Sequence, residues 1–240
     1  NSSVGCIIEK DGAVISSACT SYKGRPHAEN NALKKTKNFK KSNIYVTLEP
    51  CSHYGKTFPC TNLIIKKKIK KVFFSINDVD ERSKNKAIKI FKKNNIITKN
   101  GILKNYGYKF YKSYFLHKNK QLPYIDSKIA VSKDYFTKSK KSKWITNKQA
   151  RRVGNFLRSR YDCLISTSKT INSDNSLYNC RILGLENKSP AVIILDRFLK
   201  LKKNLKLLKN KNRKIILITE IKKNSKISYF KKKGIKILTF

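Results

Sequence analysis

The sequence has 240 residues, 39% of them hydrophobic, and its 56 Lys and Arg against 14 Asp and Glu give a formal net charge of +42. Such a chain is long enough to bury one or two cores, and its apolar runs are too short to cross a bilayer, which excludes a membrane-spanning protein. The charge suits a nucleic-acid partner, but most basic residues are lysines spread along the chain, whereas nucleic-acid readers favour Arg. We therefore attribute the charge to compositional drift.

The first half of the chain predicts alternating strands and helices, which is typical of a layered α/β domain. Val4–Glu9 and Ala13–Cys19 are predicted to form a strand pair that turns at Lys10-Asp11-Gly12. The elements expected next are a helix with Pro26 in its first turn, a strand over Asn43–Leu48, a helix over Thr61–Lys68, a strand over Lys71–Ile76 and a helix over Glu81–Asn94.

A polar Lys-Asn-Lys-Gln run before Pro123 predicts a domain boundary, with a first domain over 1–117, a linker over 118–123 and a second domain over 124–240. The second domain repeats the α/β alternation. Its expected elements are a strand over Tyr124–Val131, a helix over Lys148–Arg158, and strands over Asp162–Ser166, Pro190–Asp196, Lys214–Thr219 and Ile235–Phe240. Because there is no methionine and both termini fall in predicted strands, we expect a chain cut at both ends.

The chemistry-bearing residues of the first half are His27, Glu29, Cys51 and Cys60. One imidazole and two thiolates can hold Zn²⁺ and leave a fourth position open to a water of lowered pKa. Glu29 would accept the proton of that water and deliver it to leaving ammonia. The alternative is a zinc knuckle or ordinary core cysteines, but Pro50-Cys51 directly after a strand favours a catalytic zinc and hydrolytic deamination of a nucleobase-like ring.

The segment between the two cysteines resembles that of the bifunctional riboflavin-biosynthesis deaminase-reductase family. The family pattern Pro-Cys-x-His-x-Gly-(Lys/Arg)-Thr-Pro-Pro-Cys is matched at Pro50, Cys51, His53, Gly55, Lys56, Thr57, Pro59 and Cys60, with Phe58 in place of a proline. The resemblance implies that His53 and Lys56 face a phosphorylated pyrimidine; the residues alone favour plain loop solvation. Asn1 stands in the place of a substrate-binding asparagine, and Thr20 replaces a substrate-facing histidine.

The second half resembles the reductase half of the same family. The matching stretches are Pro123-Tyr124-Ile125, Lys143-Trp144-Ile145-Thr146 and Gln149-Ala150-Arg151, with departures at Tyr135 and Asn175. The resemblance implies that NADPH is faced by Ala130, Trp144, Thr170 and Asp174, and that the ribose-phosphate is held by Ser142, Arg158, Leu177 and Arg181. Without the resemblance, the simpler interpretation is that Trp144 belongs to the core and that Arg158 and Arg181 are solvated. Since the family continues past the equivalent of Phe240, we expect weak or no reductase activity.

The implied fold class is α/β, with a cytidine-deaminase-like three-layer sandwich followed by an incomplete dihydrofolate-reductase-like α/β domain. The implied function is zinc-dependent hydrolytic deamination of 2,5-diamino-6-ribosylamino-4(3H)-pyrimidinone 5′-phosphate in riboflavin biosynthesis, followed by NADPH-dependent reduction of the ribosyl chain. Two alternatives stay open: a nucleoside or RNA-base zinc deaminase, and a basic nucleic-acid-binding protein with structural zinc. A homo-oligomer is compatible with the sequence. Six cysteines without disulfide-framework spacing, and no signal peptide pattern, favour the cytoplasm.

Overall fold

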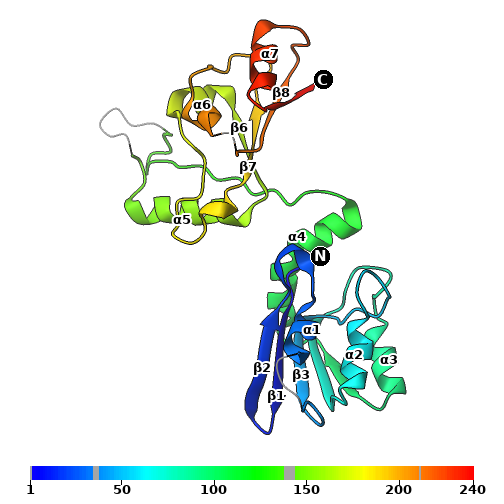
Figure 1. The fold of residues 1–240 in the computed structure, drawn as a ribbon. Coiled ribbons are helices and arrows are strands. Elements are labelled where there is room, and N and C mark those ends of the chain that lie inside the picture. Colours follow the sequence, from blue (N-terminus) through cyan, green and yellow to red (C-terminus); the bar gives the residue numbers. More distant parts are fainter. Residues whose placement is uncertain (1, 35–37, 138–143, 211) are drawn as a thin grey trace. The chain divides into compact units, whose positions relative to one another are not determined.

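The computed structural model describes residues 2–34, 38–137, 144–210 and 212–240. The chain divides into two compact units, Asn1–Ser127 and Lys128–Phe240, each with its own sheet (Figure 1). The domain limits expected from the sequence stay a prediction. Among the described residues, no helix combines the length and apolar character needed to span a membrane.

Unit 1 is built on a five-stranded sheet with the order β2-β1-β3-β4-β5. The strands are β1 (Gly5–Lys10), β2 (Ala13–Cys19), β3 (Asn43–Leu48), β4 (Lys71–Ile76) and β5 (Ile97–Asn100). β1 runs antiparallel to β2 and β3, whereas β3, β4 and β5 are parallel. The strands predicted over Asn43–Leu48 and Lys71–Ile76 are confirmed to the residue.

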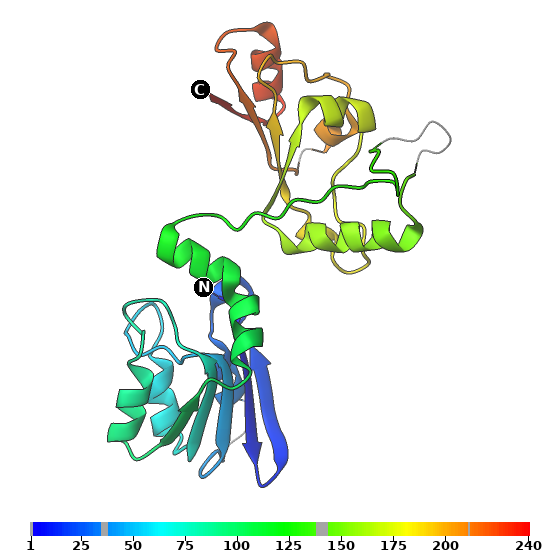
Figure 2. The ribbon, with the colours of Figure 1, turned by 180° about the vertical axis from the view of Figure 1, so that it is seen from behind.

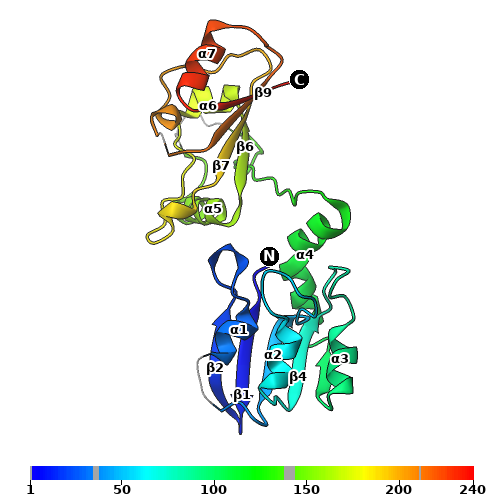
Figure 3. The same ribbon diagram turned by 45° about the vertical axis from the view of Figure 1, so that its right-hand side comes forward.

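Helices of unit 1 cover both faces of this sheet (Figures 2 and 3). They are the 3₁₀ turn Tyr22–Gly24, α1 (Ala28–Leu33), α2 (Cys60–Lys66), α3 (Ala87–Lys93) and α4 (Lys104–Lys120). Residues of α1, α2 and α3 share one hydrophobic core with alternate residues of β1, β3 and β4. On the opposite face, Gly107 of α4 approaches Ser75 of β4, and the Tyr111 hydroxyl lies 2.7 Å from Thr47 Oγ1.

Two helical expectations in unit 1 are wrong. Pro26 was expected in the first turn of a helix, but it precedes α1, and His27 is the extended N-cap residue with φ −69° and ψ 160°. The helix expected over Glu81–Asn94 begins only at Ala87. The preceding residues, 77–86, instead form turns held by the side chains of Glu49 and Asp80, because side-chain acceptors compete with helical hydrogen bonds for backbone donors.

Unit 2 is built on a parallel sheet with the order β6-β7-β8-β9. Its strands are β6 (Cys163–Thr167), β7 (Ala191–Leu195), β8 (Ile215–Thr219) and β9 (Lys236–Thr239). Its helices are α5 (Lys148–Arg160), α6 (Ser168–Asp174), α7 (Ser225–Lys232) and the 3₁₀ turns Glu186–Lys188 and Lys206–Lys209. Asn147, Thr167 and Asn224 cap the N-termini of α5, α6 and α7. The core gathers around Val192, Ile194 and Leu217.

The strand expected over Tyr124–Val131 is wrong. These residues have no regular secondary structure, and Ile129 is 73% exposed. The Tyr, Ile and Val residues of this segment suit a strand, but a strand forms only where a neighbouring strand supplies hydrogen bonds. None of the described strands pairs with this segment.

Candidate metal centre

Three donor side chains that are distant in sequence converge at one end of the unit 1 sheet. His27 is the N-cap of α1, Cys51 follows the carboxyl end of β3, and Cys60 is the first residue of α2. His27 Nδ1 lies 3.5 Å from Cys51 Sγ and 3.4 Å from Cys60 Sγ. All three donor atoms lie within 4.8 Å of one another, so a single ion could contact all of them.

These separations fit a tetrahedral zinc site. Zn–N and Zn–S bonds of about 2.0 and 2.3 Å at tetrahedral angles place a nitrogen and a sulfur donor about 3.5 Å apart. Hydrogen bonding from the Cys60 thiol, and secondarily from His27, lowers the pKa of Cys51 to about 4, which favours the thiolate needed for metal binding. The donor set and its spacing therefore suit Zn²⁺ with one coordination position left for a small molecule.

Glu29 lies on the first turn of α1 beside these donors. Its side chain is buried, with 3% of the residue exposed. Burial, which disfavours the charged form, is the main cause that raises the pKa of Glu29 to about 7, and the neighbouring Cys51 thiolate contributes to this rise. A carboxyl group whose pKa is close to neutral can both take up and release a proton, which is the property required of a general acid and base.

The buried carboxylate of Glu49 anchors the segment that follows β3 and contains Cys51. Its Oε2 accepts hydrogen bonds from the backbone N–H groups of Asp78 at 3.0 Å and Asn85 at 3.1 Å, and its Oε1 accepts from that of Ala87 at 3.0 Å. One side chain thus joins the residue before Pro50 to a turn region about 30 residues further along. From the sequence, Glu49 is expected to bond local backbone amides at the strand end; its donors are indeed backbone amides, but they lie about 30 residues away.

The segment between Cys51 and Cys60 contains the two residues expected to face the substrate. His53 is half-buried, and its Nδ1 lies 2.9 Å from the Ser83 hydroxyl. Lys56 is exposed, and the neighbouring Thr57 accepts a hydrogen bond from Arg25 Nη1 at 3.0 Å. Thr20, which replaces the histidine of the family pattern, accepts the backbone N–H of Val4 at 2.9 Å. Asn1 lies outside the described residues.

In unit 2 the structure brings together only some of the expected residues. A cavity of about 610 Å³ is lined by Trp144 and Arg181, together with Lys148, Arg151, Arg152, Asn155, Ile182 and Leu183. Trp144 is 56% exposed, and the Arg151 guanidinium lies 4.6 Å from its ring centre. The cavity is therefore strongly cationic with one aromatic wall, a combination suited to a phosphorylated ligand with a planar ring.

The other residues expected in unit 2 lie outside that cavity lining. Arg158 donates from Nη1 to the carbonyl of Asn179 at 3.0 Å, and burial lowers its pKa. Thr170 and Asp174 lie on α6, where the N–H of Thr170 donates to the helix cap at Thr167. Ala130 and Leu177 lie in segments without regular structure, and Ser142 is outside the described residues.

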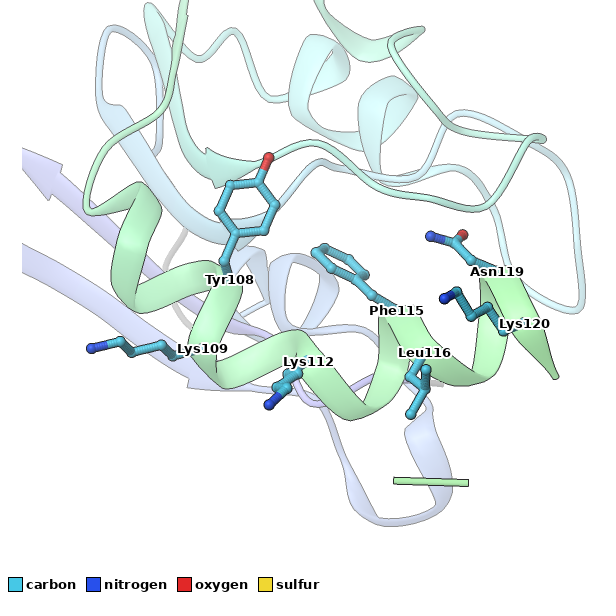
Figure 4. Close-up of a pocket in the computed structure, with 7 residues that line it drawn as sticks. All are labelled: Tyr108, Lys109, Lys112, Phe115, Leu116, Asn119 and Lys120. Carbon is cyan, nitrogen blue, oxygen red and sulfur yellow. The ribbon is translucent and has the colours of Figure 1, made fainter. Parts of the chain in front are cut away.

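A further hollow of about 470 Å³ follows one side of α4 (Figure 4). It is lined by Tyr108, Lys109, Lys112, Phe115, Leu116, Asn119 and Lys120. None of the residues expected to bind metal, substrate or cofactor lines it, and all of its lining residues belong to one helix. This surface therefore contributes nothing to the metal centre.

Two family models match the chain. Residues 1–76 match the cytidine and deoxycytidylate deaminase zinc-binding region, and residues 123–239 match the RibD C-terminal domain. The first match contains His27, Glu29, Cys51 and Cys60, and the second contains the unit 2 cavity. Together they confirm the predicted order of a deaminase-like domain followed by a reductase-like domain.

Curated relatives and solved structures agree with these matches. Riboflavin biosynthesis protein RibD of Aquifex aeolicus is 32% identical over 241 residues, which cover 99% of this chain and 67% of that protein. RibD of Buchnera aphidicola is 36% identical over 75% of this chain and 50% of its own length. Acinetobacter baumannii RibD, form 1, is 30% identical with a TM-score of 0.84, covering 99% of this chain and 67% of its own.

A solved structure from Thermotoga maritima is described as a diaminohydroxyphosphoribosylaminopyrimidine deaminase/5-amino-6-(5-phosphoribosylamino)uracil reductase. It is 27% identical to this chain with a TM-score of 0.83, and the match covers 98% of this chain and 73% of that one. The chain therefore spans between half and about three quarters of the length of these relatives.

Proposed function

Because the chain belongs to the RibD family of riboflavin biosynthesis proteins, we propose that unit 1 catalyses hydrolytic deamination of 2,5-diamino-6-ribosylamino-4(3H)-pyrimidinone 5′-phosphate. The observation that carries the proposal is the convergence of His27, Cys51 and Cys60 beside the buried carboxyl group of Glu29. A zinc site with an open position and an adjacent proton carrier is the arrangement required for this reaction.

In this proposal His27 Nδ1 and the two thiolates would hold zinc, which when bound would supply Lewis acidity and lower the pKa of a water molecule facing the amino-bearing ring carbon. Glu29 takes a proton from that water and delivers it to the departing amino group, which leaves as ammonia. Its pKa of about 7 suits both transfers near neutral pH. His53 and Lys56 bind the phosphorylated substrate, and the substrate's anionic group is attracted by the chain's positive charge.

The test is ammonia release from the pyrimidine phosphate by the zinc-loaded parent and by Glu29→Gln. We expect both proteins to hold one equivalent of zinc, and we expect the variant to lose activity by several orders of magnitude. Full activity in Glu29→Gln would refute the proton-carrier role. Tight, steeply salt-dependent binding to random duplex DNA without ammonia release would instead favour a nucleic-acid-binding protein.

For unit 2 the family relationship supports NADPH-dependent reduction of the ribosyl chain, with Trp144 and Arg181 in the cationic cavity. Trp144 is the chain's single tryptophan, so its fluorescence reports directly on that cavity. Quenching by NADPH that saturates would support cofactor binding beside Trp144, and unchanged fluorescence would argue against it. The cytoplasm is the proposed location, supported by six cysteines that form no disulfide.

A further inference from the structure

A fully buried serine outside the predicted site contacts the metal-site segment. Ser83 belongs to the turn region 77–86 between β4 and α3 and has 0% of its surface exposed. Its Oγ lies 2.9 Å from His53 Nδ1 and 3.4 Å from the backbone nitrogen of Ser52. This hydroxyl group therefore touches two successive residues immediately after Cys51, across about 30 positions of sequence.

The hydrogen-bonding capacity of these groups determines where the protons lie. A backbone N–H can only donate, so Ser83 Oγ accepts the contact from Ser52. The hydroxyl hydrogen of a buried serine needs an acceptor of its own. Among the contacts of Ser83 Oγ in the described part of the chain, His53 Nδ1 is the one able to accept it. A neutral imidazole that accepts at Nδ1 carries its proton on Nε2.

The position of Ser83 is set by groups other than His53. The N–H of Ser83 donates to the carbonyl of Asp80 at 2.8 Å, and the Asp80 carboxylate pairs with Arg82 and with Lys118 of α4. The Glu49 carboxylate binds the two ends of the same turn region. Ser83 is therefore held in place by a network that would persist without the imidazole, so it can orient His53 rather than follow it.

The Nε2 edge of His53 lies beside Gly55. A Cβ built on Gly55 would lie 3.6 Å from His53 Nε2, within van der Waals contact, so the glycine places no side chain of its own against this edge. The same imidazole thus has one nitrogen fixed by a buried hydroxyl and the other next to the smallest residue of the segment.

We propose that Ser83 is a positioning residue that holds His53 in its Nε2–H tautomer, so that His53 donates a hydrogen bond to an acceptor oxygen of the substrate. This inference rests on the proposed function of unit 1. Ser83 itself touches no substrate; it acts through His53 by fixing both the ring orientation and the nitrogen that carries the proton.

The test begins without substrate. The chain contains only three histidines, so long-range proton–nitrogen NMR spectra can be assigned with His53→Asn and with His117→Gln, an exposed residue of α4 that serves as a matched control. The parent is expected to show Nε2 of His53 protonated and Nδ1 as acceptor. Ser83→Ala is expected to lose this preference and populate both tautomers, while Ser83→Thr, which keeps the hydroxyl, retains it.

Activity then separates positioning from chemistry. Loss of one ordinary hydrogen bond predicts a rise in KM of about three- to tenfold in Ser83→Ala. The kcat and the zinc content should stay within about twofold of the parent. His53 protonated at Nδ1 in the parent, or an unchanged tautomer and KM in a folded Ser83→Ala, would overturn the inference. If Ser83→Ala does not fold, the tautomer of the parent alone decides.

Separate measurements test the deaminase activity of unit 1 and the role of Ser83. A zinc-loaded parent that releases no ammonia refutes the proposed function, whereas the tautomer of His53 is measured with no substrate present and addresses Ser83 directly. An active parent with Nδ1 of His53 protonated refutes the role of Ser83 and leaves the deaminase proposal intact.

Discussion

Gly107 of α4 lies directly over Ser75 of β4, so that a Cβ added at Gly107 would overlap Ser75 Oγ and crowd Ile76 Cγ2 at 3.0 Å. This close approach lets α4 lie against the sheet face that carries Thr47, whose hydroxyl contacts Tyr111. The packing of α4 on the sheet therefore depends on the absence of a side chain at one position.

The first prediction concerns that position. Gly107→Ala gains about 1 kcal/mol of helix propensity. Because the added Cβ overpacks the contact with Ser75 at a larger cost, we expect a net loss of about 1–2 kcal/mol in the free energy of unfolding. The measurement is urea unfolding followed by circular dichroism. The matched control is Gly154→Ala on α5, where an added Cβ meets nothing within 4 Å, so stability should not fall. Equal effects of the two substitutions would contradict the packing argument.

The second prediction concerns the metal donors. Cys60→Ser removes one of three converging ligands, so zinc affinity should fall by on the order of a hundredfold or more. Equilibrium dialysis against a zinc-buffered solution measures this directly. Cys163→Ser is the control, since Cys163 is an exposed cysteine of β6 and its loss should leave the zinc content at one equivalent. Zinc retained at parental affinity in Cys60→Ser would exclude Cys60 as a ligand.

The third prediction concerns Glu49. Glu49→Gln keeps the size of the side chain but turns one acceptor oxygen into an NH₂ group that faces backbone N–H donors. We expect a loss of about 1–3 kcal/mol in unfolding free energy, since a buried donor is left without an acceptor. Glu81→Gln, at an exposed glutamate paired with Lys84, should change stability by less than about 0.5 kcal/mol. A stable Glu49→Gln protein would show that the turn region does not depend on this carboxylate.

The fourth prediction concerns pH. Hydrogen bonding from Arg82, supported by Lys118, holds the pKa of Asp80 well below its ordinary value of 3.8. A carboxyl group with a lowered folded-state pKa stabilises the fold above the unfolded-state pKa, and this contribution is lost as pH falls below it. Asp80→Asn should therefore be less stable than the parent at pH 7, and the difference should shrink between about pH 4 and pH 2. A difference that is independent of pH over this range would contradict the ionic origin of the effect.

The parts of the fold that were predictable from sequence are those whose signal is local. Ile44, Val46 and Leu48 alternate with less buried residues, so β3 was predicted with its correct limits. The helix α4 was not predicted, because its lysines and aromatic residues are distributed around the whole circumference and show no single apolar face. The strand predicted over Tyr124–Val131 is wrong for another reason: its Tyr, Ile and Val residues suit a strand, but strand pairing depends on partners that its own sequence does not specify.

The candidate site divides in the same way. His27, Cys51 and Cys60 were identified because zinc chemistry restricts the residue types that can serve as ligands, and the structure brings their donor atoms together. Glu49 was expected to bond local backbone amides, whereas its partners lie about 30 positions away, and Ser83 was missed as a supporting residue because a serine gives no signal of a distant contact. The role of Ser83 depends on its contact with His53, and the spacing of residues along the sequence does not reveal that contact.

The hydrogen bonds from the turn region to Glu49 affect which sequence changes this protein can tolerate. Its three hydrogen-bond donors are backbone amides, which almost every amino acid supplies. These three hydrogen bonds therefore tolerate any residue type at Asp78, Asn85 and Ala87 except proline, which lacks the N–H. The amino-acid sequence of the turn region can therefore change widely while its backbone stays bound to Glu49 beside the metal ligands. A comparison of side chains alone would underestimate how strongly the backbone of this region is constrained.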